Sequence, residues 1–179
     1  MIKRVFITGI GMITPLGLDT ASTWHNLVNG KSGARTIEHF DTTEFHTKIA
    51  CEVKDFDPND FMDKKKARQL DRFTQFAMTA AQEALWQSNI NLENTDLKKV
   101  AVIIASGIGG ISTLDAQATI LNKQGPKKIS PFLIPMMLPD MASAQISMAF
   151  GTQGPNFCVV SSCSSGAEAI GNAWKLINN

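Results

Sequence analysis

The sequence has few cysteines, almost no excess of one charge and no long apolar run. Its 179 residues include 17 basic and 16 acidic side chains, which leaves a net charge of +1. This balance gives no whole-chain reason to expect a nucleic acid as partner. No apolar run reaches the ~18 residues that a membrane-spanning helix needs, so we expect no membrane partner either.

The cysteines are Cys51, Cys158 and Cys163, without C-x-x-C spacing and without a histidine nearby. We therefore expect no metal site. The start of the chain carries two charges, but its apolar stretch is too short for a signal peptide. These features predict a cytoplasmic protein whose cysteines are free thiols.

Apolar residues are plentiful. They make up 44% of the chain against 18% charged residues, which supports a packed core and excludes a disordered protein. There is no internal repeat, low-complexity segment or Gly/Ser linker. The length suits one domain, so we treat residues 1–179 as one domain or part of one.

Strand and helix patterns alternate along the chain. The predicted strands are residues 3–8, 100–105 and 157–161, with a short strand near 49–53. The predicted helices are residues 19–29, 71–88, 111–121, 141–150 and 164–177. Runs 100–105 and 157–161 lack polar alternation, which is typical of strands covered on both faces. The order predicts an α/β architecture with a mainly parallel sheet.

Two of these helices have informative faces. Helix 71–88 is expected to bury one apolar stripe. The stripe consists of Phe73, Phe76, Ala77, Ala80, Ala81, Ala84 and Leu85. Helix 164–177 begins with many small residues, which predicts close packing in the centre of the molecule. These are Gly166, Ala167, Ala169, Gly171 and Ala173.

The most informative segment is 157–167, FCVVSSCSSGA, in which an apolar strand leads through small polar residues into a helix. Such a turn exposes its central side chain, here Cys163, as in the nucleophile elbow of hydrolases. A helix N-terminus favours a thiolate, and the Cys163 backbone N–H can help to stabilise an oxyanion. The spacing alone leaves two interpretations of Cys163: it is a nucleophile, or it is the more common buried structural cysteine.

Two other patterns have ordinary explanations. Gly9-x-Gly11 and Gly107-x-Gly109 resemble dinucleotide-binding loops, but each lacks the third glycine, and tight turns explain both. Basic residues cluster at 64–68 and 127–128, and a solvated face is the usual meaning of such a cluster.

Four segments, in this order along the chain, resemble the motifs of one family. They are ITGIGMITPLG at 7–17, SGIGG at 106–110, GPKKISPF at 125–132 and SSCSSGA at 161–167. The family is the β-ketoacyl-[acyl-carrier-protein] synthases, and the type II synthases of bacterial fatty acid synthesis are the most similar branch. The resemblance covers the whole chain.

The resemblance implies a thiolase-like fold with αβαβα layers, of which this chain is an incomplete N-terminal half. It implies an acyltransferase that performs a decarboxylative Claisen condensation, with Cys163 as nucleophile and a homodimer as the intact enzyme. No bound cofactor is implied, because the substrates arrive on the phosphopantetheine of acyl carrier protein.

By the same resemblance, Ile108 matches the gate of the acyl pocket, and Leu133 matches a pocket position near the dimer interface. The family has basic positions that contact the acidic carrier protein, and the residues that match them here are Lys65, Arg68, Lys127 and Lys128. Gln69 departs from a position that is usually basic. A positive patch of this kind steers an acidic partner.

The family's two histidines, its lysine and its second oxyanion donor match no residue here. We therefore expect residues 1–179 alone not to catalyse condensation. The alternative is a non-catalytic half that binds acyl carrier protein or a partner subunit, but such members of the family replace the nucleophile that Cys163 retains. A hydrolase using Cys163 is a third reading, without a G-x-S-x-G motif or an acid–histidine pair to support it.

Overall fold

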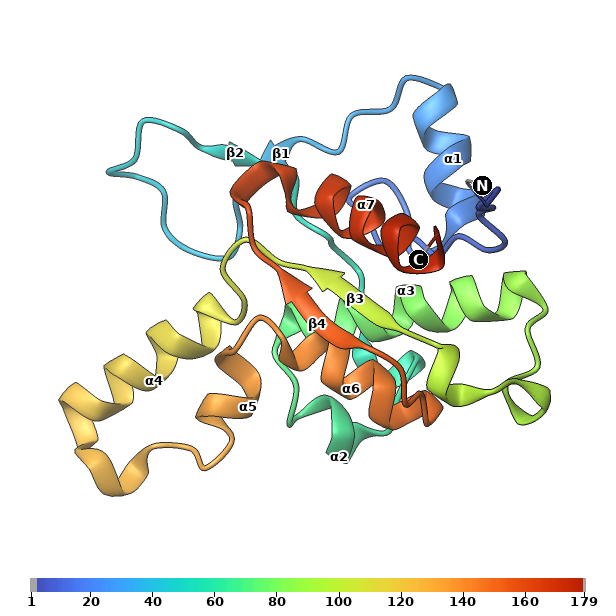
Figure 1. Ribbon diagram of the computed structural model, residues 1–179. Coiled ribbons are helices and arrows are strands. Elements are labelled where there is room, and N and C mark those ends of the chain that lie inside the picture. The colour runs from blue at the N-terminus through green and yellow to red at the C-terminus, as the bar shows by residue number, and fades with distance from the viewer. Residues whose placement is uncertain (1–2, 179) are drawn as a thin grey trace.

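The computed structural model describes residues 3–178 and is built around a parallel strand pair (Figure 1). Strand β3 (Val102–Ala105) lies beside β4 (Asn156–Val159), with Val102 opposite Asn156 and Ala105 opposite Val159. Both strands therefore end at the same edge of the sheet. The parallel pair predicted at 100–105 and 157–161 is confirmed.

Helices cover the two faces of this sheet (Figure 1). Helix α7 (Ser165–Asn178) packs on one face and α6 (Met141–Phe150) on the other. Helix α3 (Arg72–Ser88) packs against α6. The buried side chains of α6 include Ala142, Ser143 and Ile146, so the core lies between the sheet, α6 and α3.

The remaining elements surround this core. They are α1 (Thr20–Val28), β1 (Arg35–Thr36), β2 (Ile49–Ala50), α2 (Lys64–Ala67), α4 (Ile111–Gln124) and α5 (Leu133–Met137). Short 3-10 turns occupy Pro58–Asp60, Leu92–Asn94, Leu97–Lys99, Pro126–Lys128 and Ser162–Ser164. Strands β1 and β2 pair antiparallel. Helices α4 and α5 contact each other and form an arm that projects from the body (Figure 1).

All five predicted helices are confirmed as α1, α3, α4, α6 and α7. Local side chains cap the starts of α1 and α3: Asp19 Oδ1 accepts the Ser22 N–H at 2.6 Å, and Asp71 Oδ1 accepts the Phe73 N–H at 3.3 Å. The short strand near 49–53 is the two-residue β2. The structure adds α2 and α5, which are too short to show a helical period.

The strand predicted at 3–8 is wrong. The segment forms no ladder with any described residue, and Phe6 and Ile7 are 65% and 79% exposed. It is tied instead to the end of α7: the Lys3 N–H donates to Asn178 Oδ1 at 2.8 Å, and Lys3 Nζ donates to the Ile177 carbonyl at 3.0 Å. A high strand propensity does not make a strand without a neighbour to pair with.

The Gly9-x-Gly11 pattern serves packing rather than a tight turn. A Cβ at Gly9 would collide with the Ala84 carbonyl oxygen, and one at Gly11 with the Ala80 carbonyl oxygen. These glycines therefore let the N-terminal segment cross directly over the backbone of α3.

Two expectations about burial are wrong, and a third holds only in part. Helices α7 and α6 cover the two faces of the strands as expected, but the cover is incomplete, since all of β3 is half-buried and Phe157 of β4 is 36% exposed. Gly166 and Gly171 of α7 have open space around them rather than close neighbours. In α3 the buried side chains are polar rather than the predicted apolar stripe, which is only half-buried. They are Thr74, Gln75 and Thr79.

Candidate active site

Cys163 occupies the turn between β4 and α7, as the strand-turn-helix pattern predicts. It lies in the 3-10 turn Ser162–Ser164, and its side chain is exposed, so the reading of a buried structural cysteine is wrong. The preceding residue, Ser162, has a φ of +51°, in the left-handed region. The backbone strain of a non-glycine residue in this region costs about 1 kcal/mol or more, so contacts with the surrounding structure must hold the elbow in this conformation.

Serine side chains brace the elbow from within. The Ser161 N–H donates to Ser165 Oγ at 2.8 Å, and Ser165 Oγ donates to the Ser162 carbonyl at 2.7 Å. Ser164 Oγ also donates to the Ser161 carbonyl at 2.8 Å. Ser165 is only 4% exposed, so its hydroxyl satisfies backbone groups around the turn. The sequence did not reveal this role of the serines.

Ile108 lies in the loop that follows β3. Because β3 and β4 run parallel, this loop leaves the same edge of the sheet as the Cys163 elbow. The Ser106 N–H donates to the Val159 carbonyl at 3.3 Å, which joins the two segments directly. The Ile108 side chain is 66% exposed.

Leu133 is the first residue of α5 and is half-buried. The end of the same helix holds the Ile108 loop, since the Gly110 N–H donates to the Met137 carbonyl at 2.9 Å. The structure thus connects the segments that carry Ile108, Leu133 and Cys163.

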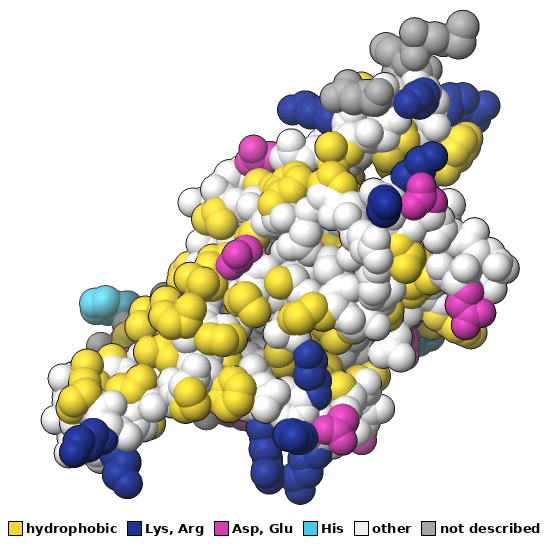
Figure 2. Space-filling model, turned by 60° about the horizontal axis from the view of Figure 1, so that its bottom comes forward, with side chains coloured by type: hydrophobic (Ala, Val, Ile, Leu, Met, Phe, Trp, Pro, Cys, Tyr) yellow, Lys and Arg dark blue, Asp and Glu magenta, His cyan; other side chains and the backbone are white. Residues whose placement is uncertain are grey.

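The predicted basic positions are exposed. Lys65 lies in α2 and Arg68 follows it, while Lys127 and Lys128 lie in the turn between α4 and α5. In Figure 2, Lys and Arg side chains gather at two places along the lower edge, with hydrophobic side chains between them. A groove of about 490 Å³ beside α2 is lined by Asp63, Lys64, Lys65, Arg68, Gln69 and Phe132.

Lys66 differs from its neighbours. It is half-buried, and its Nζ donates to Gln145 Oε1 of α6. Asp63 Oδ1 accepts the Lys65 N–H at 2.8 Å and caps the same short helix. The Lys66 bond attaches α2 to α6, while Lys65 and Arg68 stay exposed.

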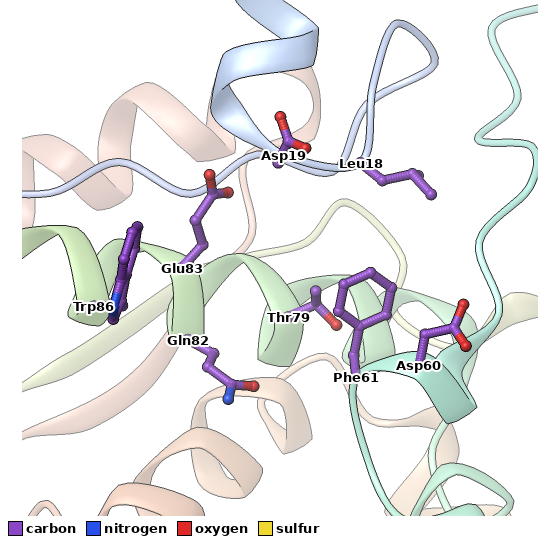
Figure 3. A pocket seen from close by; sticks show the side chains of 8 residues that line it. All are labelled: Leu18, Asp19, Asp60, Phe61, Thr79, Gln82, Glu83 and Trp86. Carbon is purple, nitrogen blue, oxygen red and sulfur yellow. The ribbon is translucent and has the colours of Figure 1, made fainter.

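The hollow shown in Figure 3 is separate from the elbow. It has a volume of about 450 Å³ and lies between α1, α3 and the Pro58–Asp60 turn. Its carboxylate Glu83 is already used, since it accepts the Thr20 N–H at 2.8 Å and the Met12 N–H at 2.9 Å. We interpret it as a surface hollow in which Glu83 holds the N-terminal segment on α3.

The other candidate groups lie elsewhere. Burial raises the pKa of the half-buried Cys158 thiol above its ordinary value. His25 lies in α1, and His39 Nε2 is 3.8 Å from Glu52 Oε1. Within residues 3–178, no three His, Cys, Asp or Glu side chains are grouped so as to hold a metal ion. In the same range, no helix is both long and apolar enough to cross a membrane.

The layered fold and the exposed elbow cysteine define a thiolase-like α/β protein. A comparison with family models matches residues 2–179 to "Beta-ketoacyl synthase, N-terminal domain". The chain belongs to this family, as its four motifs predict.

Known relatives agree with this assignment. The chain is 41% identical over 175 residues to "3-oxoacyl-[acyl-carrier-protein] synthase 2" of Staphylococcus aureus, an alignment that covers 98% of this chain and 42% of that protein. The chain therefore spans less than half the length of the curated relatives it matches.

Solved structures show the same fold. One holds a type II PKS acyl-carrier protein in complex with its ketosynthase; the TM-score is 0.81 at 23% identity, covering 98% of this chain and 46% of that one. Another is the ishigamide ketosynthase/chain length factor, with a TM-score of 0.84 at 23% identity. That alignment covers 98% of this chain and 45% of the other. The thiolase-like fold expected from the sequence is confirmed.

Proposed function

We propose that these residues form the nucleophile-bearing portion of a β-ketoacyl-[acyl-carrier-protein] synthase, an acyltransferase that extends fatty acids by two carbons. The observation that carries the proposal is the exposed Cys163 in the braced elbow between β4 and α7. The 41% identity to a 3-oxoacyl-[acyl-carrier-protein] synthase 2 supports this reaction.

The chemistry starts at the Cys163 sulfur. The thiolate attacks the carbonyl carbon of an acyl thioester, and the Cys163 backbone N–H stabilises the oxyanion that forms. The carbon–sulfur bond to phosphopantetheine breaks, its sulfur takes up the proton that the Cys163 thiol lost on forming the thiolate, and the acyl group remains on Cys163. A malonyl thioester then loses carbon dioxide, and its carbanion attacks the acyl carbonyl. A carbon–carbon bond forms, the Cys163 thioester breaks, and the β-ketoacyl product stays on the carrier protein.

We assign the acyl pocket to the segments around Ile108 and Leu133. The hydrogen bond between Gly110 and Met137 joins their segments, and the Ser106–Val159 bond joins the Ile108 loop to the strand before Cys163. An acyl chain on Cys163 thus extends toward an apolar surface formed from both loops. No bound cofactor takes part, because the carrier protein brings each substrate.

The partner we infer is acyl carrier protein, which is acidic. Lys65, Arg68, Lys127 and Lys128 supply exposed positive charge, and charge of one sign steers a partner of the other. Gln69 sits in the groove beside α2 without adding charge. A complex of a type II PKS acyl-carrier protein with its ketosynthase is among the similar structures.

We also infer a homodimer in the cytoplasm. The projecting arm exposes Ile111, Leu114, Leu121 and Ile134, an apolar surface suited to a second copy. Free thiols at Cys51, Cys158 and Cys163 fit a reducing compartment.

Acyl transfer tests the proposed function. The protein is incubated with acyl-[acyl-carrier-protein], and the acylated cysteine is located by mass spectrometry of its peptides. We expect acylation at Cys163, loss of it in Cys163→Ala, and no change in Cys51→Ala, which removes another exposed cysteine. Carrier-protein binding without acylation would instead support the non-catalytic binding half, and acylation independent of Cys163 would contradict the proposal.

A further inference from the structure

Asp71 is a buried carboxylate that joins two helix starts. It is 7% exposed and lies three residues after Arg68, at the start of α3. Its Oδ1 accepts the Phe73 N–H at 3.3 Å, an ordinary N-cap bond. Such a cap uses only one of the two carboxylate oxygens.

The second oxygen caps a different helix. Asp71 Oδ2 accepts the Thr113 N–H at 3.3 Å and the Thr113 hydroxyl at 2.5 Å. Thr113 is the third residue of α4, and the N-cap of that helix, Gly110, offers no side-chain bond. Asp71 therefore supplies the N-terminal cap that α4 lacks in its own sequence. The positive ends of α3 and α4 meet at one negative charge, which stabilises the contact.

The loop that carries Ile108 is held between this carboxylate and α5. A Cβ at Gly110 would lie 3.0 Å from Asp71 Oδ2 and would collide with the Met136 carbonyl oxygen. The Gly110 N–H donates to the Met137 carbonyl at 2.9 Å. Only a glycine fits between these groups, so the loop is fixed on both sides at Gly110, two residues after Ile108.

We propose that Asp71, through Thr113, is a positioning residue that sets where Ile108 lies and thereby which acyl chains reach Cys163. The proposal rests on the proposed function, which assigns Ile108 to the acyl pocket. Asp71 also lies shortly after α2 in the chain. It therefore holds both the basic docking surface at Lys65 and Arg68 and the loop that carries Ile108. Asp71 touches neither substrate nor Cys163 in this role.

A matched set of threonine variants tests the proposal. Thr113→Val removes the hydroxyl that Asp71 accepts, Thr113→Ser restores it, and Thr119→Val makes the same change at an exposed position of α4. Amide hydrogen exchange of residues 106–113 reports on the loop. Acyl transfer to Cys163 from carrier proteins loaded with short and long chains reports on selection.

We expect Thr113→Val to speed exchange about tenfold, the size of one lost hydrogen bond to a charged group. We expect it to change the ratio of long to short acyl chains on Cys163, with Thr113→Ser and Thr119→Val close to the unsubstituted protein. Faster exchange with an unchanged ratio would overturn the positioning role and leave the proposed function intact. Absence of acylation in the unsubstituted protein would overturn both.

Discussion

Each cysteine of this chain has its own environment, and the environment decides its chemistry. Cys163 is exposed at the start of a helix, held by a turn in which Ser162 has a positive φ. Cys158 lies only three residues before Ser161, the first serine of that segment, yet burial raises the pKa of its thiol. Cys51 is exposed but follows the two-residue strand β2, with no helix start beside it. Cys163 alone combines exposure with the elbow.

Ser165 gives a prediction at this scale. Ser165→Ala removes a buried hydroxyl and both of its hydrogen bonds, to the Ser161 N–H and the Ser162 carbonyl, which costs about 1–3 kcal/mol of unfolding free energy. Denaturant unfolding measures the loss. Ser164→Ala, at an exposed position of the same turn, is the control and costs less. Equal losses in the two variants would contradict the bracing role of Ser165.

The site was predictable only in part from its residues. The run of apolar and then small polar residues around Cys163 indicated the elbow, because that pattern depends on local sequence alone. The contact between Asp71 and Thr113 joins residues 42 apart, and no local pattern reports it. The serine network was hidden for a different reason, since runs of serine are usually exposed polar segments.

Helix caps hold the elements at defined starting points. Asp19 caps α1, and Ser22 is the donor to its side chain; Asp71 caps α3 and reaches α4. Glu83 of α3 adds bonds to the Thr20 and Met12 N–H groups and so fastens α1 and the N-terminal segment to the same helix. Helix α3 is therefore the element to which the outer parts of the chain are attached.

Asp19 gives a prediction at the scale of the element. Hydrogen bonds from Ser22 hold the pKa of Asp19 below its ordinary value of 3.8. Asp19→Ala is expected to lower the unfolding free energy by about 1 kcal/mol at neutral pH, as loss of an N-cap does. Asp19→Asn keeps an acceptor oxygen and should cost less.

The pH dependence follows from the sign of that shift. A carboxyl whose pKa is lowered by folding stabilises the protein above its unfolded pKa, and this contribution is lost as the pH falls through the lower, folded pKa. The difference in unfolding free energy between the unsubstituted protein and Asp19→Ala should therefore shrink as the pH falls below about 4, the ordinary pKa of a carboxyl group. Denaturant unfolding at a series of pH values measures this difference. A difference that grows in acid would contradict the cap.

Elements were predictable where they are long or paired. The helices at 71–88 and 141–150 carry enough turns for a helical period to be visible, and their bounds agree closely with α3 and α6. The segment 3–8 shows the limit, because a strand depends on a partner that its own residues do not specify. Helices of four or five residues, such as α2 and α5, have too few turns for a pattern.

The whole chain exposes more surface than a compact protein of its size. Its accessible area is 12041 Å² at 19.5 kDa, against about 8,500 Å² expected for a folded monomer of that mass. Part of the excess is apolar and lies in two regions, helix α7 and the projecting arm of α4 and α5. Ile170, Trp174 and Ile177 are exposed on α7, and Ile134 is exposed on the arm.

This surface predicts the behaviour of the 179-residue chain in isolation. Exposed apolar patches of this kind associate, so we expect self-association or a marginally stable fold with weak cooperativity. Sedimentation at several concentrations and thermal unfolding measure both properties. A monomer with a sharp, cooperative melt would contradict the prediction.

The reactivity of Cys163 relative to Cys51 and Cys158 tests the central claim most directly. The protein is treated with an electrophile that mimics an acyl thioester, and the rate of modification at each cysteine is followed by peptide mass spectrometry. Cys163 and Cys51 are both exposed, so accessibility alone gives them similar rates, while half-buried Cys158 lags behind. The nucleophile assignment predicts that Cys163 reacts first. Equal rates at Cys163 and Cys51, or faster modification of Cys51, would contradict it.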